Sequence, residues 1–265
     1  MAIPKRVDER IVKGCQRLRP VLMEARDRDV NEADTVTIVK SVLSDVFGWN
    51  PFFEVTSEYA IRSTYVDLAV RTEGQLRYLI EVKAIGGDLK ENHLRQAVNY
   101  AANQGVDWVV LTNGAIWQAH RVNFGKPISH ELVFQLDLIN DNVKQARFRE
   151  VAFLLSKEGM TKAAIADFHA EKQALSKFNL AAIVRSQPVL QVIRRELKRA
   201  YPKFNPPLEQ IEEQLMTEVL KRDVVDGDRA LAAIKSIRRV QRPVRSPKSA
   251  GVDSATAQNT AAPES

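Results

Sequence analysis

Two short runs of aliphatic and β-branched residues, with charged side chains inside them, constrain this chain more than any other feature. Residues 65–70 and residues 79–84 both have the composition of β-strands. The polar segment 72–75 between them contains a glycine and has the length of a hairpin loop. We therefore predict an antiparallel pair of strands here.

Three ionisable side chains interrupt these two apolar runs. Because side chains two apart on a strand point to the same face, Glu81 and Lys83 project together, while Ile80, Val82 and Ala84 point the other way. If Asp67 faces the same side of the first strand, two carboxylates and one amine converge. Charges inside a strand with apolar neighbours are costly unless they are paired or bound to a metal ion.

Two nearby carboxylates are suitable ligands for a hard divalent cation such as Mg²⁺, which takes one or two carboxylates and keeps several waters. A bound cation can polarise a phosphodiester and lower the pKa of a bound water. A neighbouring lysine can orient or deprotonate that water and stabilise developing negative charge. The pattern thus favours metal-assisted phosphodiester hydrolysis. A simpler alternative is an exposed strand face on which Glu81 and Lys83 form a surface ion pair.

A following segment adds further motifs in a fixed order. In residues 94–101, Gln96 and Tyr100 lie four residues apart, which places them on one face of the predicted helix. Residues 107–114 read DWVVLTNG, and Ile116 and Trp117 follow. Taken alone, Gln96 and Tyr100 are also compatible with an ordinary polar helix face.

Together these motifs resemble the N-terminal nuclease domain of type I restriction enzyme R subunits and its stand-alone relatives, within the PD-(D/E)xK restriction-endonuclease-like superfamily. The order Asp67, Glu81-Val82-Lys83, then QxxxY carries the resemblance, which covers roughly residues 28–140. It implies an α/β fold with a mixed sheet flanked by helices, and cleavage of DNA with Mg²⁺, for which Mn²⁺ would substitute.

The resemblance also implies roles for individual residues. Asp67, Glu81 and the backbone carbonyl of Val82 would hold the metal, and Lys83 would position or activate the attacking water. Gln96 and Tyr100 would support the site or contact the scissile strand. In this family an acidic residue of the first core helix often approaches the metal, which makes Glu32 a candidate, with Glu58 as an alternative. Glu32 is equally well explained as a first-turn glutamate favoured by the helix dipole.

The remaining pattern predicts the order of elements in the first domain, residues 1–140. Helices are expected at 7–26, at 35–47 after the N-cap Asn31, and at 89–104 before Gly105. Strands are expected at 52–61, 65–70, 79–84, 107–112 and 116–122, with one more at 132–138, and Trp108 and Val110 should be buried.

Beyond residue 140 the composition changes. No glycine occurs between Thr161 and Asp226, and Ala, Leu, Lys, Glu and Gln dominate, which predicts a helical domain at 141–245. The segment from Lys235 to Lys248 carries six basic residues and no acidic one, so it suits phosphate neutralisation, although a solvated helix end explains it as well. Residues 246–265 have the composition of a disordered tail.

The composition of the whole chain sets broad limits. The 265 residues carry a net charge of +6, a small excess that fits a polyanionic partner without identifying one. The single cysteine, Cys15, has no partner for an internal disulfide, and no apolar run approaches the length of a membrane span. We therefore expect a cytoplasmic protein that does not interact with membranes.

These observations lead to the expectation of an Mg²⁺-dependent DNA endonuclease. Type I R subunits carry a helicase-like motor after the nuclease, whereas this chain has no GxxxxGK(S/T) phosphate loop. Double-strand cutting by a nuclease with one site generally needs two copies, which favours a homodimer, and other chains of a restriction or defence system would be its protein partners. Two alternatives stay open, a non-catalytic nucleic-acid-binding module and a regulatory subunit of a larger complex.

Overall fold

The computed structural model describes residues 2–61 and 64–240, which divide into two compact units between Glu171 and Lys172. Within the described ranges, no helix is both long enough and apolar enough to span a membrane. The predicted tail at 246–265 lies outside the described residues, as does the end of the basic segment beyond Val240.

The first unit is an α/β structure built around a mixed sheet of six strands among its described residues. Its elements in chain order are α1 (Lys5–Asp27), α2 (Glu32–Asp45), β1 (Val55–Ile61), β2 (Thr64–Thr72), β3 (Gln75–Val82), the 3-10 turn η1 (Glu91–His93), α3 (Leu94–Gln104), β4 (Trp108–Thr112), β5 (Ile116–Asn123), β6 (Ser129–Asp137), α4 (Ala146–Leu155), α5 (Lys157–Thr161) and α6 (Ala164–Ala174). The predicted order of helices and strands is confirmed.

The strands lie in the sheet in the same order as in the chain. β1, β2 and β3 form one antiparallel meander, and β4, β5 and β6 form another. The two meanders meet where β3 pairs with β4 in parallel, with Glu81 opposite Leu111 and Val82 opposite Thr112. The connection from β3 to β4 contains α3, because two neighbouring parallel strands need a crossover that brings the chain back to the edge of the sheet at which the first strand began.

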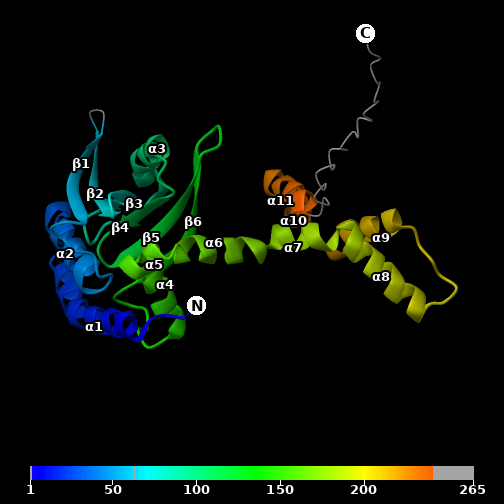
Figure 1. Ribbon diagram of the computed structural model, residues 1–265, viewed down its shortest axis with the longest axis horizontal. Coiled ribbons are helices and arrows are strands. Elements are labelled where there is room, and N and C mark those ends of the chain that lie inside the picture. The colour runs from blue at the N-terminus through cyan, green and yellow to red at the C-terminus, as the bar shows by residue number, and fades with distance from the viewer. Residues whose placement is uncertain (1, 62–63, 241–265) are drawn as a thin grey trace, which may run out of the picture. The chain divides into compact units, whose positions relative to one another are not determined.

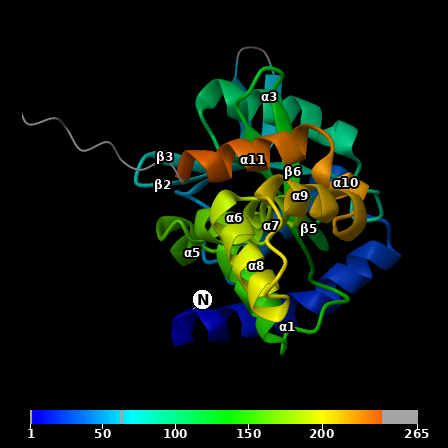
Figure 2. The same cartoon turned by 90° about the vertical axis from the view of Figure 1, so that its right-hand side faces the viewer.

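Helices cover both faces of the sheet. Figures 1 and 2 show α3 on one side, and α1 on the opposite side. Leu79 and Val109 pack against α3, whereas Ile80 and Val110 belong to the larger core on the side of α1, α2 and α4. Alternate residues of each strand thus point to opposite faces. Trp108 and Val110 are buried, as predicted.

The first unit continues beyond residue 140, where the sequence analysis placed the end of the first domain. α4, α5 and most of α6, up to Glu171, belong to it because their apolar side chains enter the large core beside the sheet. Phe148, Phe153 and Ile165 are among these buried residues. β1 also begins later than expected, at Val55, because residues 51–54 form turns.

The second unit is mostly helical, as predicted. After the end of α6 it contains α7 (Lys177–Val184), α8 (Gln187–Ala200), α9 (Leu208–Gln214), the π-helical segment η2 (Leu215–Val219), α10 (Arg222–Val225) and α11 (Asp228–Val240). α11 packs along α7, and α8 contacts α9. Pro188 lies in the first turn of α8, where a proline is tolerated because the N–H it lacks would have no helical partner.

Candidate functional site

The carboxylate of Asp67 is held against the end of the neighbouring strand. Asp67 lies in β2, one residue before the pair that Leu68 forms with Ile80 of β3. Its Oδ2 accepts a hydrogen bond of 2.7 Å from the backbone N–H of Val82, the last residue of β3. The side chain of Asp67 therefore bonds the end of β3 beyond Leu68–Ile80, the last backbone pair between β2 and β3. This places the Asp67 carboxylate beside the Glu81-Val82-Lys83 backbone.

Lys83 lies between two carboxylates from different elements. Its Nζ donates to Oε1 of Glu81 at 2.9 Å and lies 3.3 Å from Oε2 of Glu32. Glu81 and Lys83 are mostly buried, with side-chain exposures of 16% and 20%, whereas Glu32 is 49% exposed. Glu32 opens α2, whose N-cap Asn31 accepts the N–H of Asp34 through its side chain as predicted. The structure thus brings Asp67, Glu81, Lys83 and Glu32 together, and we call these four residues the acidic site.

The electrostatics of the acidic site depend on burial and on an excess of negative charge. Burial raises the pKa of Glu81; the hydrogen bond from Lys83 opposes this shift, and the charges of Asp67 and Glu32 add to it. Burial of Lys83 lowers the pKa of its amine. The hydrogen bond to Glu81 and the negative charges of Glu81, Glu32 and Asp67 have the larger effect, so the pKa lies above its usual value. Lys83 is therefore an ammonium at neutral pH. Three carboxylates facing one ammonium leave two formal negative charges.

This donor set suits a divalent cation with hard oxygen ligands. Mg²⁺ is bound by one or two carboxylates and retains much of its water shell, and the carboxylates of Asp67 and Glu81 supply such ligands. In the described ranges, no group of three or more His, Cys, Asp or Glu side chains is placed so that together they could hold a metal ion. A metal held here would thus depend on few protein ligands, and its charge would balance the two negative charges of the acidic site.

Gln96 and Tyr100 lie on α3, which packs against β3 and β4. Although they are one turn apart, Gln96 is exposed and Tyr100 is buried in the core between α3 and the sheet. The boundary between the exposed and buried sides of α3 runs between them. Their action on the acidic site stays a prediction. The side chain of Glu58, the alternative acid, lies outside the described residues.

Comparisons of this chain with protein-family models, with curated proteins and with solved structures find no match. The geometry of the acidic site therefore carries the functional argument together with the sequence motifs.

Two residues beside the acidic site had no role in the sequence-based prediction. The carbonyl of Thr112 accepts the backbone N–H of Lys83 at 2.8 Å, and the side chain of Asn113 bonds the segment that follows Lys83. Both belong to the LTNG motif, residues 111–114, which contributes to the family resemblance without a role for either residue. The position of Asn113 and Gly114 directly after a buried strand was the available signal.

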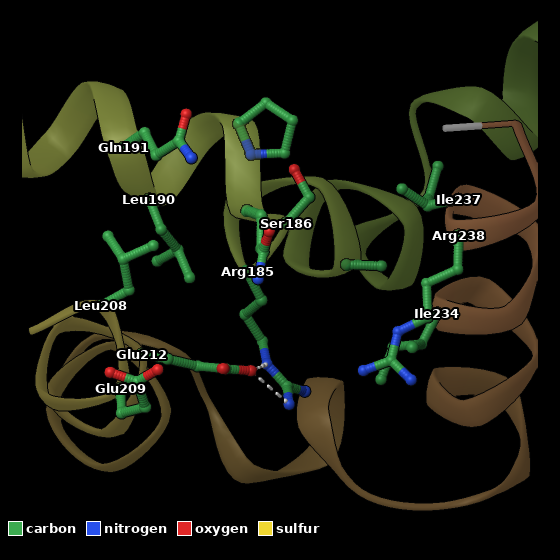
Figure 3. Close-up of a pocket in the computed structure, with 13 residues that line it drawn as sticks. Arg185, Ser186, Leu190, Gln191, Leu208, Glu209, Glu212, Ile234, Ile237 and Arg238 are labelled. Atoms are coloured by element: carbon green, nitrogen blue, oxygen red, sulfur yellow. Dashed lines mark hydrogen bonds and ion pairs between the residues drawn. The ribbon is translucent and has the colours of Figure 1, made fainter. Parts of the chain in front are cut away.

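The second unit contains a separate cavity of about 570 Å³ between α7, α8, α9 and α11. Figure 3 shows Arg185 beside Glu212, and two hydrogen bonds of 3.1 and 3.0 Å join them. Aliphatic residues such as Leu190 and Ile234 line much of the rest. Because Glu209 and Glu212 offset Arg185 and Arg238, the lining has no net formal charge, and it does not indicate a particular ligand.

Proposed function

We propose that this protein is a divalent-metal-dependent DNA endonuclease whose first unit has a restriction-endonuclease-like fold. The observation that carries the proposal is the acidic site, where the carboxylates of Glu81 and Glu32 flank the Lys83 ammonium and Asp67 bonds the same strand end. The ordered motifs and the helix-and-strand order support the same assignment. The preference for DNA as substrate comes from the family resemblance, and the net charge of +6 is compatible with it.

Each residue of the acidic site has a distinct role in this proposal. Asp67 and Glu81 would hold Mg²⁺ or Mn²⁺, with the backbone carbonyl of Val82 as a further ligand and Glu32 in an outer position. The metal would supply polarisation of the phosphodiester and a bound water of lowered pKa. As an ammonium, Lys83 donates hydrogen bonds to the attacking water or to a phosphate oxygen, where it opposes the negative charge that develops during hydrolysis.

The test is cleavage of supercoiled plasmid by purified protein with Mg²⁺ or Mn²⁺. We expect nicked and then linear products, and a loss of about 100-fold or more in Asp67→Asn and Lys83→Met, the range seen when one stabilising group is removed. Lys157→Met is the matched control, because Lys157 also pairs with a carboxylate, that of Glu54 at 2.7 Å, but belongs to another ion pair.

Two results would contradict the nuclease assignment. One is equal cleavage by wild type, Asp67→Asn and Lys83→Met, which would assign the activity to another site or to a contaminant. The other is no cleavage with either metal while all variants bind DNA equally, with an affinity that falls steeply with salt. That second result would instead favour the non-catalytic binding module.

A further inference from the structure

The end of β4 and the start of the following turn, residues 112–114, contact the chain immediately after the acidic site. The N–H of Lys83 donates to the carbonyl of Thr112 at 2.8 Å, beside the last parallel pair of β3 and β4, in which Val82 lies opposite Thr112. Asn113, only 6% exposed, follows. The backbone of Lys83 is thus attached to the end of β4, while its ammonium lies between Glu81 and Glu32.

The buried amide of Asn113 bonds three backbone groups. Its Nδ2 donates to the carbonyls of Ile85 and Gly87, each at 3.1 Å, and its Oδ1 accepts the N–H of Ile116 at 2.8 Å. Both ends of the amide are therefore satisfied, as buried polar groups require. One side chain joins the segment leaving β3 to the start of β5.

The segment 84–88 is held closely on its other sides. The N–H of Gly87 donates to the carbonyl of Ala84 at 2.8 Å, which closes a turn. A Cβ added at Gly86 would lie 2.3 Å from Oδ1 of Asp29, so the backbone passes directly against that carboxylate. The two bonds from Asn113 hold this compact segment against β4 and β5.

Gly114 of segment 112–114 also lies close to α2, which carries Glu32. Gly114 has a φ of +82°, and a Cβ added there would lie 3.5 Å from Cγ2 of Thr35. Thr35 is fully buried, and its Oγ1 donates to the carbonyl of Asn31 at 2.8 Å in the first turn of α2. Residues 112–114 therefore bond the backbone of Lys83 and lie close to the helix that carries Glu32.

From these contacts we propose that Asn113 is a positioning residue of the acidic site. It fixes the segment that follows Lys83 and so keeps the ammonium between Glu81 and Glu32, without touching substrate itself. The catalytic part of this role rests on the proposed nuclease function. Asn113→Ala removes all three hydrogen bonds. Asn113→Asp has nearly the same shape and retains an acceptor for Ile116, but its carboxylate cannot donate to Ile85 and Gly87.

Asn140→Ala is the matched control. The Nδ2 of Asn140 donates to Oδ2 of Asp137 at 2.8 Å in an exposed turn after β6, so this variant removes one amide side chain from the same unit. Unfolding is followed by tryptophan fluorescence, because all three tryptophans, Trp49, Trp108 and Trp117, lie in the first unit. Activity is then compared only where each variant is folded.

Three measurements test the role of Asn113. Amide hydrogen exchange of a peptide covering 84–88 should accelerate at least 10-fold in both Asn113 variants and remain unchanged in Asn140→Ala. Affinity for Mn²⁺ should change little, because Asn113 bonds none of the proposed metal ligands. The rate of plasmid cleavage at saturating Mn²⁺ should fall by about 10- to 100-fold, as when a distant change misplaces a catalytic group. If Asn113→Ala does not fold, the comparison of Asn113→Asp with wild type and Asn140→Ala still tests the role.

The outcomes separate the positioning role from the proposed function. If wild type cuts plasmid and the folded Asn113 variants cut as fast with unchanged exchange at 84–88, Asn113 has no positioning role. If exchange accelerates while cleavage is unchanged, Asn113 is structural only. If wild type neither binds Mn²⁺ nor cuts, the nuclease proposal and the catalytic part of the positioning role both fail.

Discussion

His120 of β5 should make the first unit sensitive to mild acid. Its side chain is buried, with 6% exposure, and neither ring nitrogen has a hydrogen-bond partner among the described residues. The ring centroid of His130 lies 5.3 Å away, and Glu91 is 3.7 Å from Nε2 of His130. Burial and, to a smaller extent, the charge of His130 lower the pKa of His120 to about 4, from an ordinary value of 6.5. The folded state therefore requires this imidazole to be neutral.

The direction and size of the acid effect follow from these pKa values. As pH falls below about 6.5, the unfolded chain binds a proton at His120 before the folded chain does, so stability declines until about pH 4. Between pH 8 and pH 5 the loss is about 2 kcal/mol, since one pKa unit corresponds to about 1.4 kcal/mol. His120→Leu removes this titration. It should also relieve the burial of unpartnered nitrogens, which contributes about 1 kcal/mol at any pH.

Urea unfolding at pH 8 and pH 5, followed by tryptophan fluorescence, measures the effect in the first unit alone. The advantage of His120→Leu over wild type should grow by about 2 kcal/mol at pH 5, a shift of about 0.7 M urea in the relative midpoints at an m-value of about 3 kcal/mol/M. His93→Gln, which replaces a half-buried histidine of η1, is the control. An advantage that is equal at the two pH values would refute the reasoning, because carboxylate titrations are shared by both proteins and cancel.

Two further predictions concern the packing of α1. Gly14→Ala should destabilise the first unit by about 2 kcal/mol in the same urea assay, because the added Cβ would lie 2.4 Å from the backbone carbonyl oxygen of Asp45. Gly105→Ala is the comparison: nothing lies within 4 Å of its added Cβ, so it measures the cost of a positive φ alone. An equal loss of stability in the two variants would contradict the packing argument. Cys15 is buried, and this burial raises the pKa of its thiol to about 12. At pH 8 it should therefore react with a thiol reagent only when the protein unfolds in urea. Rapid labelling of the native protein would disprove its burial.

The sequence allowed prediction of the parts of the acidic site that depend on local periodicity. Glu81 and Lys83 are close because residues two apart on an extended chain share a face. The distance of 2.9 Å from Nζ of Lys83 to Oε1 of Glu81 agrees with that rule. Glu32 was open to two interpretations. The structure is compatible with both, since Glu32 opens α2 and also approaches Lys83.

Other features depended on tertiary structure. No local pattern indicates that Asp67 bonds the N–H of Val82, because that contact depends on where the β2–β3 ladder ends. The i, i+4 rule placed Gln96 and Tyr100 on one helix face, but it does not predict which of them is buried. Composition predicted that α4 is a helix, whereas its attachment to the first unit follows from the surface on which Phe148 and Phe153 pack.

The order of the strands has a consequence for a chain that is still being synthesised. All three carboxylates of the acidic site, and Lys83, precede α3, whereas the backbone partner of Lys83 and the amide of Asn113 follow it. Among the described strands, β3 and β4 form the one parallel pair, and the two parts of the site meet at its end. A nascent chain that stops short of β4 therefore carries every charge of the acidic site and lacks the turn that holds Lys83. The acidic site would thus be complete only after the β1–β3 meander has paired with the β4–β6 meander.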